Sequence, residues 1–254
     1  MDDATLLERN LHGLAALYRL IGRCAGSVIE LDGAVGSIAH TAPDYPWLNA
    51  LVCEPDASFE RVLEHLPKTA EHDRLSVWTC GPEQVDAASA AGFSRLIARV
   101  PAMSMELTGA TRSRGASEPI ALAEAGALSD MAYGNGEREL ERTLARLPPE
   151  VAQARGRRDA GGRVVAAAVL LESGEDCSLQ YVATRPDAQR LGHGTALLSD
   201  ALAQARRRGC TSTSLQSSDA GVQLYRRLGY RTVGQLELRR REATPRARRC
   251  TPRR

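Results

Sequence analysis

The turn from Gln189 to Thr195, "QRLGHGT", combines residue types that can bind a phosphate group. Gly192 and Gly194 lack a Cβ, so backbone N–H groups at these positions can approach a ligand closely. The run that follows has helical spacing, and the first turn of a helix carries unpaired N–H groups and the positive end of the helix dipole. Arg190 adds a charged donor for phosphate oxygens. The turn predicts a pyrophosphate cradle or, alternatively, a tight connection between a strand and a helix.

Two well-known phosphate-binding motifs do not fit this turn. No Lys follows the glycines, as the motif G-x-x-x-x-G-K-[ST] requires, and the spacing is not that of G-x-G-x-x-G. The apolar run over 177–184 predicts a strand before the turn, and the spacing over 194–209 predicts a helix after it. The turn is therefore expected at the carboxyl end of a strand, where the next helix begins.

The elements that must position this turn alternate along the chain. A helix is predicted over 4–22, followed by short strands with a hairpin at Gly33. The later part repeats a similar order: a strand over 118–124, helices between 124 and 147, a strand hairpin, and then alternating strands and helices. This order predicts an α/β fold of the mixed α+β kind, a mixed sheet flanked by helices. Pro101 predicts that the strand over 93–107 lies at an edge or is bent.

A stretch rich in Gly, Ser, Thr and Arg divides the chain. We predict a first domain over 1–108, a linker over 109–118, a second domain over 119–242 and a basic tail over 243–254. Each of the two domains is long enough to bury its own core.

Composition excludes several classes of protein. No apolar run is long enough to span a membrane, and the acidic, polar start does not resemble a signal peptide, so we expect a cytoplasmic protein. The last sixteen residues hold eight Arg and one Glu, and the remaining chain has a net charge of −5. The tail lacks interleaved aromatic residues, so no nucleic-acid partner is expected. The six cysteines are scattered, which predicts free thiols and no metal site.

Two motifs at the right separation resemble one enzyme superfamily. The run from Gln189 to Gly194 resembles the Q/R-x-x-G-x-G/A motif of the GCN5-related N-acetyltransferases (GNAT), which binds the pyrophosphate of acetyl-coenzyme A. Pro186 precedes it as the family's fourth strand ends. Farther on, "SDAGVQLYRRLGY" resembles the family signature N-x-x-A-x-x-L-Y-x-x-L-G-F/Y, with Ser218 in place of Asn and Gly221 in place of Ala. One helix and one strand separate the two motifs, as in the family.

The resemblance extends to the whole chain. "SAAGFSRL" in the first half is similar to the "LGY" corner of the second, although the first half has no Q/R-x-x-G-x-G run. The chain thus resembles a tandem GNAT protein: two GNAT-like domains, each with a central, mostly antiparallel mixed sheet flanked by helices. The N-terminal repeat would be degenerate and without cofactor binding. A small α/β domain of separate origin is the alternative.

The resemblance implies which residues contact acetyl-CoA, the expected cosubstrate. The free part of the fourth strand would hold the thioester and the pantetheine, the turn would hold the pyrophosphate, and Ser218 would contact pantetheine. Tyr225 stands where many members place the general acid for the thiolate, although it could equally be a core residue. The expected contacts are Tyr181, Val182, Ala183, Thr184, Gln189, Arg190, Leu191, Gly192, His193, Gly194, Thr195, Ser218 and Tyr225.

The expected activity is that of an N-acetyltransferase, an enzyme of the EC 2.3.1 type, acting by direct transfer in a ternary complex. Glu137 is the candidate general base, with Glu172 and Asp176 as others, and each could instead be a solvated surface charge. A small-molecule amine is the expected acceptor, and a protein amine is also compatible. Tyr45 and Trp47, in a proline-bounded loop, could cover a cleft between the domains or simply pack.

Two points stay open at the level of the sequence. The alternative to an enzyme is a catalytically silent acyl-CoA-binding or scaffold protein, and the acyl group could be longer than acetyl. The chain is compatible with a monomer or a homodimer.

Overall fold

The computed structural model describes residues 1–54, 57–66, 74–108 and 117–241. In these ranges eleven strands form one sheet, in the order β1-β2-β3-β4-β11-β5-β10-β9-β8-β7-β6. The predicted mixed α/β fold is confirmed. The strands are β1 (Gly26–Leu31), β2 (Ala34–Ala39), β3 (Ala50–Cys53), β4 (Ser76–Cys80), β5 (Arg95–Glu106), β6 (Glu118–Pro119), β7 (Ala152–Arg158), β8 (Val164–Ser173), β9 (Asp176–Thr184), β10 (Ser212–Gln216) and β11 (Arg231–Arg240).

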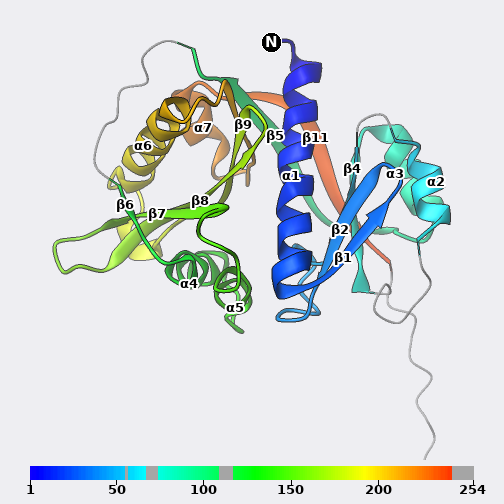
Figure 1. Cartoon of the computed structure of the whole chain (residues 1–254), viewed down its shortest axis with the longest axis horizontal. Helices are drawn as coiled ribbons and strands as arrows, with labels where there is room; N and C mark the ends of the chain where they lie inside the picture. The colour runs from blue at the N-terminus through cyan, green and yellow to red at the C-terminus, as the bar shows by residue number, and fades with distance from the viewer. Residues whose placement is uncertain (55–56, 67–73, 109–116, 242–254) are drawn as a thin grey trace, which may run out of the picture.

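Helices cover both faces of the sheet (Figure 1). Residues of β8 alternate between the two cores, because successive side chains of a strand point to opposite faces. One core holds α1, α4 and α5, the other holds α6 and α7, and a third core lies under α2 and α3. The helices are α1 (Asp3–Ala25), α2 (Phe59–Glu64), α3 (Pro82–Ala90), α4 (Leu122–Tyr133), α5 (Glu139–Leu144), α6 (His193–Arg207) and α7 (Val222–Leu228).

Helix α1 lies across the middle of the sheet and contacts strands of both halves (Figure 1). It begins where predicted, with the Asp2 carboxylate accepting a hydrogen bond from the Thr5 N–H at 2.9 Å. Gly13 allows close packing, since a Cβ there would lie 2.9 Å from the Cβ of Ser178. The buried Asn10 amide donates to the carbonyls of Met103 and Leu215, and so fixes α1 to β5 and β10.

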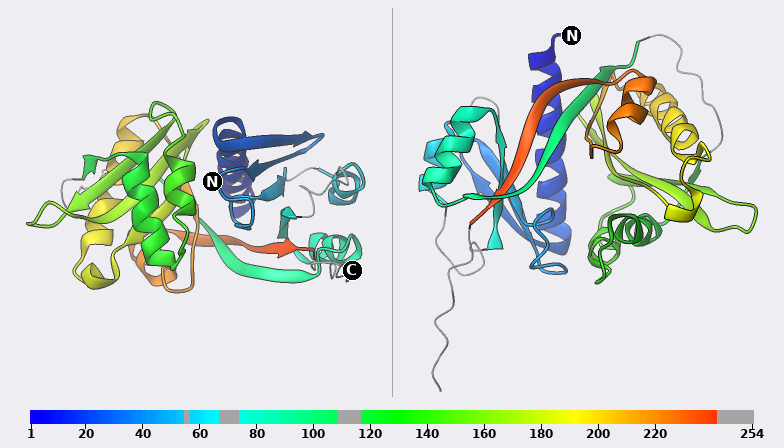
Figure 2. Two further views of the ribbon diagram at one scale, coloured as in Figure 1. Left: turned by 90° about the horizontal axis from the view of Figure 1, so that it is seen from below. Right: turned by 180° about the vertical axis from the view of Figure 1, so that it is seen from behind.

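The two halves repeat one pattern of strand pairing. In the first, β1, β2 and β3 pair antiparallel and β3 pairs parallel with β4; in the second, β7, β8 and β9 pair antiparallel and β9 pairs parallel with β10. The last strand of each half then pairs with the other half: β5 lies beside β10, and β11 beside β4. These exchanged strands also pair with each other, and Figure 2 shows them crossing together between the halves.

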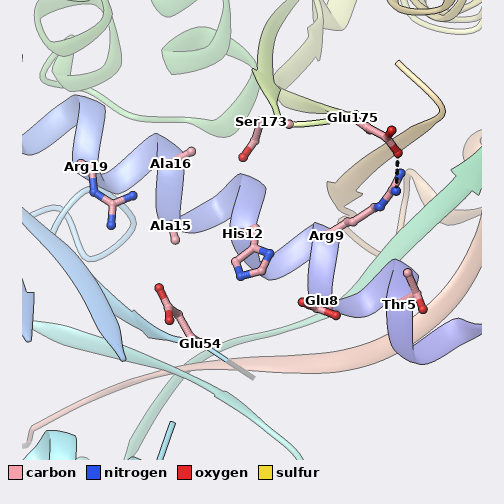
Figure 3. A pocket seen from close by; sticks show the side chains of 11 residues that line it. Thr5, Glu8, Arg9, His12, Ala15, Ala16, Arg19, Glu54, Ser173 and Glu175 are labelled. Carbon is pink, nitrogen blue, oxygen red and sulfur yellow. Dashed lines mark hydrogen bonds and ion pairs between the residues drawn. The ribbon is translucent and has the colours of Figure 1, made fainter. Parts of the chain in front are cut away.

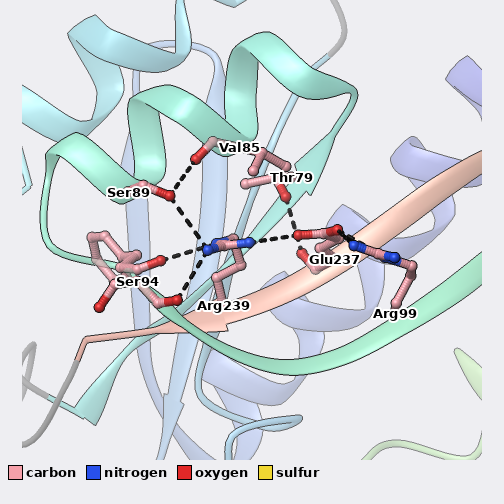
Figure 4. A network of polar contacts seen from close by, with 8 residues as sticks. Thr79, Val85, Ser89, Ser94, Arg99, Glu237 and Arg239 are labelled. Carbon is pink, nitrogen blue, oxygen red and sulfur yellow. Dashed lines mark hydrogen bonds and ion pairs between the residues drawn. The ribbon is translucent and has the colours of Figure 1, made fainter.

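A polar network holds the exchanged strand β11 on the first half (Figure 4). The Arg239 guanidinium donates to the carbonyls of Phe93 and Ser94, and it pairs with the Glu237 carboxylate at 2.6 Å. Glu237 also binds Arg99 of β5. Arg239 therefore belongs to the folded sheet, ahead of the basic tail.

Two local expectations differ from the structure. β6 covers only Glu118 and Pro119, because the Glu124 carboxylate accepts from the Ala121 N–H at 3.1 Å and α4 begins at Leu122. β5 is not an edge strand. Its pairing with β10 ends at Ala102, so the missing N–H of Pro101 lies where the strand leaves that partner.

The predicted division of the chain stays a prediction. Residues 109–116 of the expected linker and the whole expected tail lie outside the described residues. Ser117, at the end of the linker, is buried and donates from its backbone N–H to Asp200 of α6 at 3.0 Å. No described helix is both long and apolar enough to cross a membrane.

Candidate active site

The turn from Gln189 to Thr195 leads into an uncapped helix, as the sequence predicts. Helix α6 begins at His193, its N-cap Gly192 has φ 84°, and no side chain caps its first turn. Arg190 also has positive φ, 63°, a conformation that costs a non-glycine residue about 1 kcal/mol or more. A Cβ on Gly192 would meet no atom within 4 Å, so open space adjoins this backbone. The turn presents free N–H groups to its surroundings.

The other residues of the turn differ in exposure. The Leu191 side chain is 70% exposed, whereas His193 and Thr195 are half-buried. Gly194 packs closely, because a Cβ there would lie 3.3 Å from the hydroxyl of Thr184. The turn is thus a close strand-to-helix connection at Gly194 and open to its surroundings at Gly192; the binding of a pyrophosphate there stays a prediction.

The end of strand β9, before this turn, has no partner strand on the side of β10; we call it the free stretch. Its pairing with β10 covers only Asp176 to Ser178, so residues 179–184 lie beyond the last pair. The register with β8 also shifts between Gln180 and Ala183, where Tyr181 has φ 50°. A bulge of this kind re-aims backbone groups and often adjoins an active site. The expected contacts Tyr181, Val182, Ala183 and Thr184 all lie in this free stretch.

Helix α4 binds two carbonyls of the free stretch. The Ser129 hydroxyl donates to the Tyr181 carbonyl at 3.2 Å, and the Tyr133 hydroxyl donates to the Val182 carbonyl at 3.0 Å. The Tyr133 ring is 49% exposed. The pKa of Tyr133 is raised, by desolvation of its hydroxyl and then by nearby Tyr225 and Tyr45. Sequence reasoning missed Tyr133, although it stands only four residues before Glu137, the candidate general base.

Tyr225 lies on the opposite side of β9 from α4, in the core under α6 and α7. Its ring packs edge to face on Tyr230, with 5.7 Å between centroids. A Cβ on Gly221 would lie 2.9 Å from the Tyr225 ring, which gives a reason for Gly in place of the family's Ala. The Tyr225 hydroxyl has no hydrogen-bond partner among the described residues, and burial raises its pKa. The side chain therefore stays protonated near neutral pH.

Ser218 lies seven residues before Tyr225, ahead of the start of α7 at Val222. It is exposed, and its carbonyl accepts hydrogen bonds from the Ser217 hydroxyl and the Gly221 N–H. Its hydroxyl forms no hydrogen bond within the described ranges.

The candidate carboxylates lie in different places. Glu137 is exposed in the turn between α4 and α5 and forms no hydrogen bond or ion pair with a described residue. Glu172 pairs with Arg208, and the buried Asp176 accepts from the hydroxyls of Ser212 and Ser214. Asp176 begins β9 while Thr184 ends it, about 26 Å away along an extended strand. Glu172 and Asp176 are therefore structural.

Glu139, two residues after Glu137, is a candidate that sequence reasoning missed. It is half-buried, and its pKa is raised, first by desolvation and then by the charges of Asp130 and Glu137. A raised pKa suits a carboxylate that must exchange protons near neutral pH. No signal in the sequence separates Glu139 from its neighbours, because the shift depends on packing of the turn.

The first half repeats the glycine corner that follows α7 but has no tyrosine at the position of Tyr225. Gly92 has φ 90° and Gly229 has φ 103°. The residue after each glycine donates its N–H to the carbonyl five positions earlier, Ala88 in the first half and Tyr225 in the second. Ala88 thus stands at the position of the tyrosine. Helix α2 in turn is capped by the Ser58 side chain, so its first turn is not free as that of α6 is.

A cavity of about 420 Å³ lies away from these residues, along the outer face of α1 (Figure 3). Glu8, Arg9, His12 and Glu54 line it, together with the hairpin between β8 and β9. Arg9 is bound to Glu175 at 2.7 Å. None of the expected contacts of acetyl-CoA lines this cavity. Within the described ranges, no group of three or more His, Cys, Asp or Glu residues is arranged to hold a metal ion.

Comparison with known families identifies the class of the second half. Residues 152–232 match the family model of the acetyltransferase (GNAT) domain. The chain therefore contains a GNAT domain, and that domain includes the turn, the free strand and Tyr225. The comparison with curated proteins gave no match.

Solved structures share the fold over nearly the whole chain. A GCN5-related N-acetyltransferase from Kribbella flavida has a TM-score of 0.68 at 20% identity, covering 92% of this chain and 96% of that one. A GNAT-family protein from Novosphingobium aromaticivorans has a TM-score of 0.61 at 17% identity, covering 96% and 100%. One from Sphaerobacter thermophilus has a TM-score of 0.55 at 16% identity, covering 90% and 92%. Both halves of the chain thus belong to a fold that recurs in GNAT proteins.

Proposed function

We propose that the protein is an acetyl-CoA-dependent N-acetyltransferase that transfers the acetyl group directly to an amine in a ternary complex. One observation carries the proposal. The stretch of β9 that has no partner on its β10 side leads through residues 185–192 to the uncapped start of α6, and Tyr225, whose hydroxyl bonds to no described residue, packs in the adjoining core.

The residues present fit acetyl-CoA. The N–H groups around Gly192 and the Arg190 side chain would hold the pyrophosphate, because open space adjoins the backbone there. Residues 181–184 would bind the pantetheine through backbone groups, and Ser218 has a free hydroxyl for the same purpose. The first half lacks both the turn and the tyrosine, so one cofactor site per chain is proposed.

Bound acetyl-CoA supplies an activated thioester. In the transfer, a C–N bond to the amine forms and the C–S bond breaks, so one proton must leave the amine and one must reach the sulfur. Tyr225 donates from its hydroxyl, since a thiolate with a conjugate-acid pKa near ~8.5 is stabilised by a positioned phenol. The carboxylate that accepts the amine proton comes from the turn between α4 and α5, with Glu137 and Glu139 as candidates.

The proposed acceptor is a small-molecule amine, with a protein amine as the second possibility. The charges around Glu139 are mixed, since Asp130, Glu137 and Asp44 raise its pKa while Arg142 lowers it. The net charge of −5 of the chain ahead of its last sixteen residues is compatible with a cationic amine.

Release of free thiol from acetyl-CoA, measured across a panel of amines, tests the proposal. We expect amine-dependent release by the wild-type chain. Tight binding of acetyl-CoA without release for any amine would instead identify an acyl-CoA-binding protein, and a preference for longer acyl-CoA would change the acyl group. Absence of binding to any acyl-CoA would contradict both.

A further inference from the structure

A loop of the first half, residues 40–49, is held in a fixed shape by one buried side chain. The Asn49 amide accepts from the Ala39 N–H and donates to the carbonyls of Ala42 and Tyr45, all at 2.7 Å. Asn49 is fully buried. The loop therefore presents Thr41 and Tyr45 on a rigid base.

From this base, three hydrogen bonds cross to the second half. The Asn135 amide donates to the Tyr45 hydroxyl at 3.0 Å, the hydroxyls of Thr41 and Thr143 lie 2.6 Å apart, and Arg142 donates to the Thr41 carbonyl at 3.2 Å. All three partners belong to the turn between α4 and α5 or to α5 itself. Tyr45 is the one that reaches the turn.

Asn135 connects the Tyr45 hydroxyl to the start of α5 through Asp130. Its amide also donates to the Asp130 carboxylate at 3.2 Å, and Asp130 accepts from the N–H groups of Leu140 at 3.1 Å and Glu141 at 2.9 Å. Asp130 is buried, so these bonds fix the first turn of α5. That turn carries Glu139.

Within the turn, the residues on either side of Asn135 are glycines in open space. Gly134 has φ 75°, and a Cβ on Gly134 or Gly136 would meet nothing within 4 Å. Glycines in open space can adopt many backbone conformations. The Tyr45 hydroxyl therefore contributes an external brace to a segment that is mobile by composition.

This turn adjoins the proposed site of acetyl transfer. Tyr133, directly before Gly134, donates to the Val182 carbonyl in the free stretch of β9. The opposite side of β9 is covered by α6, α7 and Tyr225. The turn after α4 therefore lies on the face of β9 opposite Tyr225, and we expect the amine to approach Val182 from this face.

We propose that Tyr45 is a positioning residue for the acceptor amine, through which the first half of the chain controls the acceptor side of the second. This inference rests on the proposed function. Tyr45 acts through Asn135 and Asp130 to fix two neighbouring segments, the turn after α4 with Glu137 and the start of α5 with Glu139. None of the hydrogen bonds described for this brace involves the turn from Gln189 to Thr195, where the pyrophosphate of acetyl-CoA would lie.

The test compares Tyr45→Phe with Thr79→Val in the full chain. Phe keeps the ring and removes the hydroxyl that Asn135 binds. Thr79 is the matched control, because its hydroxyl donates to the Glu237 carbonyl at 3.3 Å, which is another contact between a strand of the first half and the last strand of the second. Spermidine and a lysine peptide serve as amine probes, and thiol release gives separate Michaelis constants for amine and acetyl-CoA.

We expect Tyr45→Phe to raise the Michaelis constant for the amine about fivefold, the factor for one lost hydrogen bond, with that for acetyl-CoA unchanged. Asn135→Ala should raise the amine constant at least as much, since it also removes the bond to Asp130, and the double variant should match Asn135→Ala, because the Tyr45 contact is already lost in it. Thr79→Val should change neither constant. A parallel rise for acetyl-CoA, full additivity, or an unchanged amine constant would overturn the proposal.

Hydrogen exchange keeps the inference testable if neither amine is acetylated, the result that would count against the proposed function. Tyr45→Phe should speed amide exchange in a peptide covering 135–142 and leave a peptide from α6 unchanged. Equal exchange in wild type and variant would overturn the role of Tyr45 whatever the activity.

Discussion

At the scale of single residues, two tyrosines of the same cluster have different hydrogen bonding. Tyr225 and Tyr230 pack edge to face, yet only Tyr230 is bonded, by the Thr213 hydroxyl at 2.7 Å. The Tyr225 hydroxyl bonds to no described residue and is not one of the fully buried atoms without a partner, so solvent reaches it. The hydroxyl of a buried tyrosine usually has a hydrogen-bond partner, so this free one is available to a bound ligand.

This contrast predicts opposite effects of two conservative changes. Tyr225→Phe should lower turnover at least tenfold, with acetyl-CoA affinity unchanged and stability equal or slightly higher, because no hydrogen bond is lost. Tyr230→Phe should reduce the free energy of unfolding by about 1 kcal/mol and leave turnover near wild type. Thiol release and urea denaturation measure the two effects. Full activity of Tyr225→Phe would show that the tyrosine is a core residue.

Glu139 gives a second prediction, which concerns pH. A carboxyl whose pKa is raised in the folded state favours the protonated form, so folding is favoured below the ordinary pKa and weakened as pH rises through the raised value. Glu139→Gln should therefore leave the melting temperature unchanged at pH 4 and raise it at pH 7, while lowering turnover. Glu137→Gln is the matched change in the same turn. A lower melting temperature of Glu139→Gln at pH 7 would contradict the argument.

At the scale of elements, the proposed cofactor site is the junction of β9 and α6. The junction needs a strand that separates from its neighbour, a bulge at Tyr181 and a helix that starts without a side-chain cap. Glycine at position 192 adopts the left-handed backbone conformation without strain, and its missing side chain leaves the adjoining space open.

Two glycines at opposite ends of α6 allow the cost of backbone strain to be distinguished from a loss of acetyl-CoA binding. Gly192 has φ 84° and Gly209 has φ 95°, and a Cβ on either would meet no atom within 4 Å. Alanine at each position should cost a similar 1–2 kcal/mol (roughly) of stability. Only Gly192→Ala should weaken acetyl-CoA binding, by about tenfold, since its methyl group enters the cradle. Calorimetric titration of both variants checks this, and equal affinities would place the pyrophosphate elsewhere.

At the scale of the whole molecule, the halves share one sheet. β5 and β11 each complete the sheet of the other half, and α1 packs across both. Neither half therefore has all of its own strands, although their strand order is alike. Unfolding of one half must break the pairing of the other, so a single cooperative transition is expected.

Arg239 tests this coupling. Its guanidinium joins Glu237 and the carbonyls of Phe93 and Ser94, and its side chain is largely buried. Arg239→Met should lower the free energy of unfolding by about 2 kcal/mol and keep one transition by both far- and near-ultraviolet circular dichroism. Arg163→Met, which breaks an exposed pair with Asp159, should cost at most about 1 kcal/mol. Two separate transitions in Arg239→Met would show that the halves unfold independently.

The sequence by itself determined the local features: the glycine turn, the strand and helix on either side of it, the "LGY" corner with Tyr225, and the alternation of elements that predicts a mixed sheet. Each follows from backbone preferences of neighbouring residues, so a short stretch specifies it. The exchange of β5 and β11, the contact of Tyr133 with Val182 and the brace from Tyr45 to Asn135 were decided only by the tertiary structure. They join residues from 49 to more than 100 positions apart, where local preferences carry no information about contact.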